Sequence, residues 1–533
     1  MTDFQLTPEQ EAIVAEVRHG KDSLLIRAYA GCAKTTTLTL ASKEIRIPGL
    51  ALAFNKHIKE ELARRFPPNF SVQTMNGLGH QAIIRALPRV TVRLDDKKLG
   101  RLLGEAIKYH KVELSADQWE EARQLLQSAM HNGLVPSRYA TGLELLSDTL
   151  ENWHELADMV YMEPESKALI IDIVHYTLCE WIEESYKGVI TFDDQSYFSV
   201  CLTGKFPQFP LLMVDEAQDL SPLNHEMVRR SVRPDGRLIV CGDPKQAIYG
   251  FRGADYTSMD KLKALRGRWS ELPLNTTFRC PKAVVQRQQE HAPGFRAAQG
   301  NIEGTFVRMP NGTREIATDH GDGSVWREPA TEWTWQDVED ASPPGAQIAV
   351  LCRNNAPLLS LAFKLLRQRV PVAMLGRDIG QGLVRLAKSI CPKMETSLED
   401  FALLLEAWKI KEVSLAMANG KENKVDGITD RAECLEAVMS YPDVSTVGEL
   451  CREVQQLFAR DKGRITLSSI HKAKGLEWDV VMLLDPWRIP SKQSLLAVAK
   501  GDEGPLTQEK NLKYVAETRS KNVLLHASMG DFE

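Results

Sequence analysis

Lys34 and Thr35 stand where a phosphate-binding loop places its functional side chains. They follow an apolar, strand-like run, Ser23–Ala28, and open a helical stretch. Such a loop directs backbone N–H groups at the phosphates and adds a lysine for the β- and γ-phosphates and a hydroxyl for Mg²⁺. Gly31 gives the loop one flexible residue, but the generic G-x-x-x-x-G-K pattern has a second glycine where this chain has Ala33. Taken alone, the segment is equally well interpreted as a glycine-poor turn.

A second segment places two carboxylates directly after a buried strand. The apolar run Phe209–Val214 ends in Asp215 and Glu216. In a phosphate-hydrolysing site, Asp215 would hold Mg²⁺ and Glu216 would accept a proton from the attacking water. The alternative is a solvated acidic turn, and an apolar run that ends in Asp-Glu is common enough that this segment alone does not decide between them.

A third segment combines an amide, aromatic rings and an arginine after another strand-like run, Arg237–Cys241. Aromatic rings offer stacking surfaces to bases, and arginine suits phosphate. The alternative is a pair of core aromatics beside a surface arginine. The residues concerned are Gln246, Tyr249, Phe251 and Arg252.

The elements that must position these residues alternate between strands and helices at both ends of the chain. Buried strands separated by helices are typical of a parallel, doubly wound α/β sheet. Residues 97–188 and Ser397–Gln455 instead have helical spacing of apolar residues, including Trp119–Met130 and Leu143–Met159, and are expected to be helical insertions. The expected strands of the two sheets are Ser23–Ala28, Leu50–Phe54, Phe209–Val214 and Arg237–Cys241, then 347–352, 370–375, Ile465–Ile470, Val480–Leu484 and Val523–Leu525.

Composition sets outer bounds on the class of protein. The 533 residues suggest three or four domains, at roughly 150 residues each. The formal charge of −5 excludes a histone-like basic coat, although a local basic channel remains compatible with it. Nine scattered cysteines without a C-x-x-C spacing argue against a zinc or iron–sulfur site and indicate a reducing compartment. The sequence has no signal-peptide pattern at its start and no run of 18 apolar residues, so no membrane association is expected.

Longer motifs occur in an order that identifies a family. VDEAQD, GDPKQAIYGFRGA, SSIHKAKGLEWDVV and YVAETRS follow one another along the chain. Together they resemble the UvrD/Rep/PcrA family of superfamily-one DNA helicases. AYAGCAKTTTL, LAFNKHIKEELARRF and TFRCP are most similar to the F-box DNA helicase branch, although no F-box segment is expected ahead of a first motif that begins near residue 5.

The resemblance implies a function and a fold. The chain is expected to be an ATP hydrolase, a DNA helicase or translocase that moves 3′ to 5′ on single-stranded DNA in replication, recombination or repair. The expected fold is α/β, with two RecA-like lobes that bind ATP and Mg²⁺ between them. The expected boundaries are 1–90 with 189–272 for the first lobe, 91–188 for its helical insertion, 273–380 with 456–533 for the second lobe, and 381–455 for its small insertion.

The resemblance also implies roles for matching residues. The catalytic set is Lys34, Thr35, Asp215, Glu216, Gln246 as γ-phosphate sensor, Arg279, and Arg519 as arginine finger, with Thr35 and Asp215 on the metal. The nucleotide-binding set is Gln10 on the adenine edge, Ala30, Gly31, Cys32, Ala33, Lys34, Thr35, Thr36, Phe278 stacked on adenine, Gly475, and Glu477 on the ribose. The DNA-binding set is Phe54, Asn55, Thr74, Asn76, Tyr249, Phe251, Arg252, His471 and Lys472.

Two departures from the family pattern leave alternatives open. The family has glycine at position 33, and alanine there costs about 1–2 kcal/mol if the backbone must be left-handed. The family has histidine where this chain has Asn76, which weakens the DNA assignment of that position. One alternative is a remodeller that strips proteins from DNA, because the second insertion is short. The other is a degenerate, non-catalytic DNA-binding subunit.

Partners follow from the same resemblance. We expect single-stranded DNA and single-strand/double-strand junctions, with replication or recombination proteins as further partners, and a monomer in a bacterial cytoplasm or, for a phage-encoded protein, in the host's. The adjacent carboxylates Asp193 and Asp194 are expected to be structural rather than a metal pair.

Overall fold

The computed structural model describes residues 5–53, 55–160, 162, 164–248, 257–308, 344–418, 422–441, 444–459, 463–499, 501 and 503–532. The chain divides into two compact units: residues 1–29 with 33–275, and residues 30–32 with 276–533. Among the described residues, none of the helices has the length and apolar character needed to cross a membrane.

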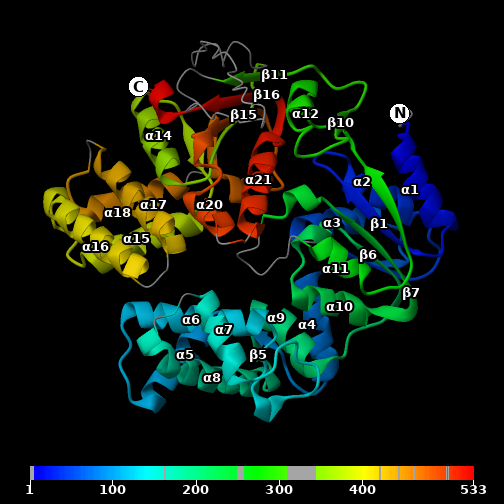
Figure 1. Ribbon diagram of the computed structural model, residues 1–533, viewed down its shortest axis with the longest axis horizontal. Coiled ribbons are helices and arrows are strands. Elements are labelled where there is room, and N and C mark those ends of the chain that lie inside the picture. The colour runs from blue at the N-terminus through cyan, green and yellow to red at the C-terminus, as the bar shows by residue number, and fades with distance from the viewer. Residues whose placement is uncertain are drawn as a thin grey trace. The chain divides into compact units, whose positions relative to one another are not determined.

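The first unit is built on a six-stranded parallel sheet in the order β3-β2-β6-β7-β1-β8 (Figure 1). Parallel strands require crossover connections, and here these are helices. The strands are β1 Ser23–Ala28, β2 Gly49–Ala53, β3 Phe70–Thr74, β6 Phe209–Val214, β7 Val232–Gly242 and β8 Trp269–Leu274. The helices that connect or flank them are α1 Pro8–His19, α2 Lys34–Ser42, α3 Lys56–Arg65, α4 Met75–Ala86, α10 Pro222–Ser231 and α11 Ser258–Lys263.

A helical segment extends this unit between β3 and β6 (Figure 1). Its apolar residues join those of the sheet in one continuous core, which includes Leu52, Leu103 and Trp181. The segment contains α5 Lys98–His110, α6 Ala116–His131, α7 Leu150–Met159, α8 Pro164–Tyr186 and α9 Phe192–Phe198, with the short strands β4 Arg93–Leu94 and β5 Val189–Ile190. The helical interpretation of Leu143–Met159 is wrong before Leu150, because residues 143–149 are irregular, with a bend at Leu145 and an isolated bridge at Leu146, ahead of the Thr149 cap.

The second unit has its own six-stranded parallel sheet in the order β11-β16-β15-β12-β14-β13. The strands are β11 Thr305–Arg308, β12 Ile348–Cys352, β13 Val372–Met374, β14 Ile465–Ser469, β15 Trp478–Leu484 and β16 Ser520–Ala527, beside a two-stranded sheet of β9 Thr276–Thr277 and β10 Arg296–Ala297. The helices are α12 Lys282–Arg287, α14 Ala356–Arg367, α15 Arg377–Ile390, α16 Leu398–Ala418, α17 Glu422–Met439, α18 Val447–Ala459, α19 Ile470–Ala473, α20 Lys492–Ala499 and α21 Gly504–Glu517.

The expected fold class is confirmed: both large sheets are parallel, and helices separate their strands. The expected strand near residue 50 begins at Gly49 and is described as far as Ala53. The nine cysteines are all buried and free.

Candidate functional site

Lys34, Asp215 and Asp243 all follow strands that lie side by side in the first sheet. β1 and β6 each pair in parallel with β7, so their carboxyl ends meet at one edge. Ligands of open α/β sheets bind in the crevice outside the carboxyl ends of the strands. The topology therefore brings the segment of Lys34 together with the segments of Asp215 and Asp243, which lie more than 180 residues later in the sequence.

The side chains at this edge contact one another directly. The Thr35 hydroxyl donates a hydrogen bond to Asp215 Oδ2 at 2.9 Å. The Lys34 ammonium lies 3.5 Å from Glu216 Oε1 and forms an ion pair with it. The backbone N–H of Glu216 donates to Asp215 Oδ1 at 2.9 Å, so both oxygens of that carboxylate are held in place. The structure thus joins four of the predicted residues in one cluster.

Two residues without a predicted role complete this cluster. Gln218 donates from Nε2 to Glu216 Oε2 at 2.6 Å and accepts from the Asp243 N–H through Oε1 at 2.9 Å. Asp243 in turn accepts from Gln246 Nε2 at 2.6 Å. Gln218 therefore links the proposed base to the loop of the proposed γ-phosphate sensor. Gln218 lies in the motif VDEAQD and Asp243 in the motif GDPKQ. Their place in these motifs was the only feature of the sequence that indicated a role for them.

Burial and the close carboxylates perturb the charges of the cluster. Burial, and then the nearby Glu216, raises the pKa of Asp215 to about 6. Burial also raises the pKa of Asp243. Burial on its own lowers the pKa of Lys34, but Glu216 and Asp243 outweigh it and hold that pKa above its ordinary value. One ammonium thus faces three carboxylates, an excess of negative charge that a cation would balance.

Thr35 and Asp215 have the chemistry of a magnesium site. A hydroxyl and a carboxylate held 2.9 Å apart present hard oxygen ligands to one point. Mg²⁺ is commonly bound by one or two carboxylates, with water and substrate phosphates completing its octahedron. Among the described residues no group of three or more carboxylate, histidine or cysteine side chains could hold a metal by itself. The residues present therefore fit a magnesium ion that arrives with a nucleotide.

The backbone of the loop before α2 is left-handed at two positions. Gly31 has φ +69°, and Ala33, the residue before Lys34, has φ +57° and ψ +38°. Glycine adopts this region freely, but for alanine it costs about 1–2 kcal/mol. The left-handed backbone at Ala33, which the sequence analysis gave as the condition for strain at this residue, is therefore present in the structure.

Replacing Ala33 by glycine is expected to stabilise the first unit by roughly 1 kcal/mol, because the left-handed backbone then carries no Cβ penalty. Thermal melting of the two chains measures this. Ala41→Gly is the matched control, because Ala41 lies inside helix α2 and glycine there is expected to destabilise by about 1 kcal/mol or more. Equal destabilisation by both changes would contradict the assignment of strain to position 33.

The remaining predicted residues of the first unit have local partners. Gln10 is fully buried, accepts from the Thr7 N–H in a capping box and donates to the Thr37 hydroxyl at 3.1 Å. The Thr36 hydroxyl accepts from Arg65. Asn55 and Thr74 cap α3 and α4 at the ends of β2 and β3, on the same edge of the sheet, and Asn76 donates to the Phe192 carbonyl. Phe54, Tyr249, Phe251 and Arg252 lie outside the described residues.

The second unit holds another predicted group. Arg279 Nε donates to Glu477 Oε2 at 2.5 Å, and the neighbouring Phe278 is 43% exposed, with a ring available for stacking. Gly475, just before Glu477, has φ +87°. His471 and Lys472 lie on the short helix α19, where Lys472 is exposed. The structure thus brings together the arginine and the glutamate that the sequence separates by almost 200 residues.

Residues 30–32 belong to the second unit through backbone hydrogen bonds. The Phe278 N–H donates to the Gly31 carbonyl, and the Ala30 N–H donates to the Tyr514 hydroxyl, both at 2.9 Å. The Cys32 side chain is fully buried. Two of the predicted nucleotide-binding residues, Ala30 and Gly31, are therefore held by their main chain.

Arg519 is turned inward in this structure. It is 1% exposed, and its guanidinium donates to the Val515 carbonyl at 3.0 Å and to the Leu476 carbonyl at 3.3 Å. Its second terminal amine lies 3.4 Å from the Thr518 hydroxyl. A role on a phosphate would require the guanidinium to exchange these carbonyls for phosphate oxygens.

Comparison with known proteins gives matches over most of the chain. Residues 6–265 match the UvrD/REP helicase N-terminal domain, and residues 404–529 match the UvrD-like helicase C-terminal domain. F-box DNA helicase protein 1 of Schizosaccharomyces pombe is 24% identical over 98% of this chain and 57% of its own length. DNA helicase II of Escherichia coli is 24% identical over 69% of this chain and 51% of its own. The chain spans about half the length of these curated relatives.

Proposed function

Because the chain belongs to the UvrD-like helicase family, we propose that it is an ATP-dependent DNA helicase or translocase that moves 3′ to 5′ on single-stranded DNA. The observation that carries the proposal is the cluster of Lys34, Thr35, Asp215 and Glu216, held by direct contacts at the carboxyl edge of the first sheet. ATP hydrolysis needs a lysine, a metal-binding hydroxyl and carboxylate, and a base, and these four side chains supply them.

In this proposal each side chain has one task. Lys34 neutralises charge on the β- and γ-phosphates, and Glu216 accepts the proton of the attacking water. Thr35 and Asp215 would hold Mg²⁺, which supplies electrostatic stabilisation of the transferred phosphoryl group. Gln246 is held by Asp243 in the loop that Gln218 connects to Glu216, so a change at the γ-phosphate has a hydrogen-bonded path to the segment that follows residue 246.

The second unit is proposed to contribute cations and a stacking ring. Arg279 and Arg519 would stabilise charge on the γ-phosphate, as arginine does in many phosphoryl transfers. Phe278 would stack on the adenine, and Glu477 would meet the ribose. We also propose the domain arrangement with boundaries 1–90 with 189–272, 91–188, 273–380 with 456–533, and 381–455, in which two RecA-like lobes each carry an insertion.

The proposed substrates are single-stranded DNA and single-strand/double-strand junctions. The exposed side chains of Asn55 and Lys472 are the described members of the proposed DNA-binding set that are open to solvent. We propose further that the protein acts as a monomer in replication, recombination or repair, in a bacterial cytoplasm or, if phage-encoded, in that of the host. Binding of this kind depends on phosphate contacts and should weaken steeply with salt.

Lys34→Ala is expected to abolish ATP hydrolysis that single-stranded DNA stimulates, because the phosphates lose their only lysine in this cluster. The measurement is steady-state ATP turnover with and without an oligonucleotide. Lys43→Ala is the matched control: Lys43 is exposed at the end of the same helix, and turnover should stay unchanged. Unwinding of duplexes with a 3′ or a 5′ single-stranded tail then tests the direction, and unwinding from the 5′ tail alone would contradict it.

The degenerate, non-catalytic alternative makes a different prediction for Ala33. If strain at this residue had silenced the site, Ala33→Gly would raise ATP hydrolysis from nil. We expect measurable hydrolysis in the natural chain and a change of only a few fold in the variant. The preserved contacts of Thr35 with Asp215 and of Lys34 with Glu216 support an active site.

A further inference from the structure

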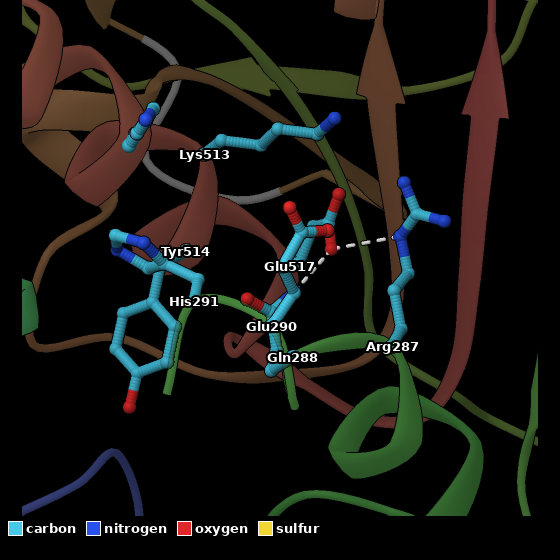
Figure 2. A pocket seen from close by; sticks show the side chains of 8 residues that line it. Arg287, Gln288, Glu290, His291, Lys513, Tyr514 and Glu517 are labelled. Atoms are coloured by element: carbon cyan, nitrogen blue, oxygen red, sulfur yellow. Dashed lines mark hydrogen bonds and ion pairs between the residues drawn. The ribbon is translucent and has the colours of Figure 1, made fainter. Parts of the chain in front are cut away.

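A pocket of about 330 Å³ lies within the second unit, and none of the side chains that line it belongs to the sets assigned to the nucleotide or to DNA. It is formed by residues 287–291, which begin at the end of α12, and by the part of α21 from Lys510 to Glu517. Figure 2 shows the side chains that line it. They are Arg287, Gln288, Glu290, His291, Lys510, Lys513, Tyr514 and Glu517.

One side chain that lines the pocket, Glu517, is a buried carboxylate that already accepts hydrogen bonds from its neighbours. Glu517 is 1% exposed and accepts hydrogen bonds from Arg287 Nε at 2.9 Å and from Gln288 Nε2. It also contacts His526 Nε2 at 3.1 Å. Burial opposes ionisation of this carboxyl, but Arg287 and His526 outweigh it and hold the pKa of Glu517 below its ordinary value. Burial lowers the pKa of His526 to about 4, so this histidine is neutral near pH 7.

The cationic side chains of the pocket have fewer hydrogen-bond and ion-pair partners than Glu517 has. Arg287 uses Nε for Glu517 and places its guanidinium 4.2 Å from the centre of the Phe306 ring. Lys513 is half-buried, and the described residues give its ammonium neither a hydrogen bond nor an ion pair. Burial lowers the pKa of Lys513, the negative charge of Glu517 acts to raise it, and the positive charges of Arg287 and Arg308 lower it further. In Figure 2 the ammonium of Lys513 and the guanidinium of Arg287 flank Glu517.

The charge of this region is therefore positive once its pairs are counted. The carboxylate of Glu517 accepts hydrogen bonds from both Arg287 and Gln288. The carboxylate of Glu290 is exposed, so solvent and salt screen its negative charge. Lys510 adds a third lining cation at the rim. Crowding cations in a partly desolvated pocket without matching anions is unfavourable unless an anion binds there.

We propose that this pocket binds a phosphate group, with Lys513 and the terminal amines of Arg287 as its principal ligands. A planar guanidinium and a compact ammonium side by side are the pair that proteins use for phosphate oxygens. The phosphate has two possible sources, a free phosphate anion or the backbone of a DNA strand. Lys513 lies on α21, which ends at Glu517, two residues before Arg519, so occupancy would stabilise the end of the helix that precedes the proposed arginine finger.

The test measures thermal stabilisation by inorganic phosphate, against sodium chloride at matched ionic strength. The full chain with Lys34→Ala is used, so that phosphate binding at the loop before α2 does not contribute. Phosphate is expected to raise the melting temperature of this variant, since a ligand that binds only the native state stabilises it. Adding Lys513→Gln should weaken the apparent phosphate affinity by about tenfold or more, because a charge-assisted contact is lost.

Two control variants, one at a lysine outside the pocket and one that retains the charge at position 513, separate loss of a phosphate ligand from other effects. Lys492→Gln removes an exposed lysine at the start of α20 and should leave phosphate stabilisation unchanged. Lys513→Arg retains the charge and should retain stabilisation, which separates loss of a ligand from damage to the fold. Equal stabilisation of all variants by phosphate, or of none, would overturn the proposal.

A binding experiment with a labelled single-stranded oligonucleotide identifies the source of the phosphate. If the DNA backbone supplies it, Lys513→Gln weakens DNA binding and lowers the slope of log affinity against log salt by about one. If a free anion supplies it, DNA affinity stays the same while phosphate stabilisation is lost. Because neither experiment contains ATP, these results do not depend on the proposed helicase activity.

Discussion

Replacing Glu216 by glutamine is expected to lower kcat for ATP hydrolysis by about 10²- to 10⁴-fold while ATP still binds. Glutamine has the same shape but does not accept the proton of the attacking water. Of the two adjacent carboxylates, Asp215 accepts a hydrogen bond from the Thr35 hydroxyl, with which it would hold Mg²⁺. In the proposed function this leaves Glu216, which contacts Lys34, for the proton transfer.

The local structure supports this division of roles. Glu216 has φ +52°, a left-handed conformation that a glutamate adopts at a cost of about 1–3 kcal/mol. Backbone strain of this kind clusters at functional sites, and here it directs the carboxylate towards Lys34, 3.5 Å away. Gln218 holds the other oxygen at 2.6 Å, so the side chain has a fixed direction.

Single-turnover hydrolysis and equilibrium binding of ATP separate the two effects. Glu60→Gln is the matched control, because Glu60 lies on the surface of α3 and forms a long pair with Lys56 at 3.9 Å. Surface pairs of this kind are worth at most about 1 kcal/mol, so its kcat should equal that of the natural chain. An unchanged kcat in Glu216→Gln would show that Glu216 is not the base. Loss of ATP binding would show that Glu216 acts in binding the nucleotide instead.

Lys98→Met is expected to destabilise the first unit by about 3–5 kcal/mol, because it leaves a buried carboxylate without its cation. Lys98 and Asp194 are both 0% exposed and their charged atoms lie 3.2 Å apart. The Lys98 ammonium also donates to the Ser185 hydroxyl at 2.7 Å and the Val189 carbonyl at 2.8 Å. Burial lowers the pKa of Lys98, although Asp194 acts to raise it.

Asp194 is at the centre of a network that joins three elements of the helical segment. It accepts hydrogen bonds from Trp181 Nε1 at 2.7 Å on α8 and from the Thr191 N–H at 2.8 Å at the start of α9. Lys98 begins α5, so the pair fixes α5, α8 and α9 against one another. The expectation that Asp193 and Asp194 are structural agrees with this geometry for Asp194, whose oxygens are filled by protein donors.

Thermal melting, combined with hydrogen exchange in α5, α8 and α9, is the measurement for this pair. Lys56→Met is the control, since it removes the surface pair with Glu60 and should cost less than about 1 kcal/mol. The double variant Lys98→Met with Asp194→Asn should cost less than the sum of its single changes, because neither charge is then left alone. Exact additivity would show that the two residues act independently.

The observed elements agree best with those predicted from the sequence where strands are buried on both faces. β1 Ser23–Ala28 and β6 Phe209–Val214 have the bounds that their apolar runs predicted. Continuous apolar runs mark such strands because neither face meets water. The prediction failed at residues 143–149, where leucines at helical spacing precede α7 without forming a helix. Periodicity does not tell whether a leucine packs from a helix or from an irregular segment.

What the sequence by itself determined is the set of side chains and the order of the motifs that place the chain among UvrD-like helicases. Tertiary structure decided which oxygen each donor meets, that Gln218 bridges Glu216 and Asp243, that Ala33 is left-handed, and that Lys98 and Asp194 are buried together. The physical reason is that side-chain type and spacing along the chain are local, whereas contact, desolvation and backbone strain depend on segments that only the parallel sheet brings to one edge.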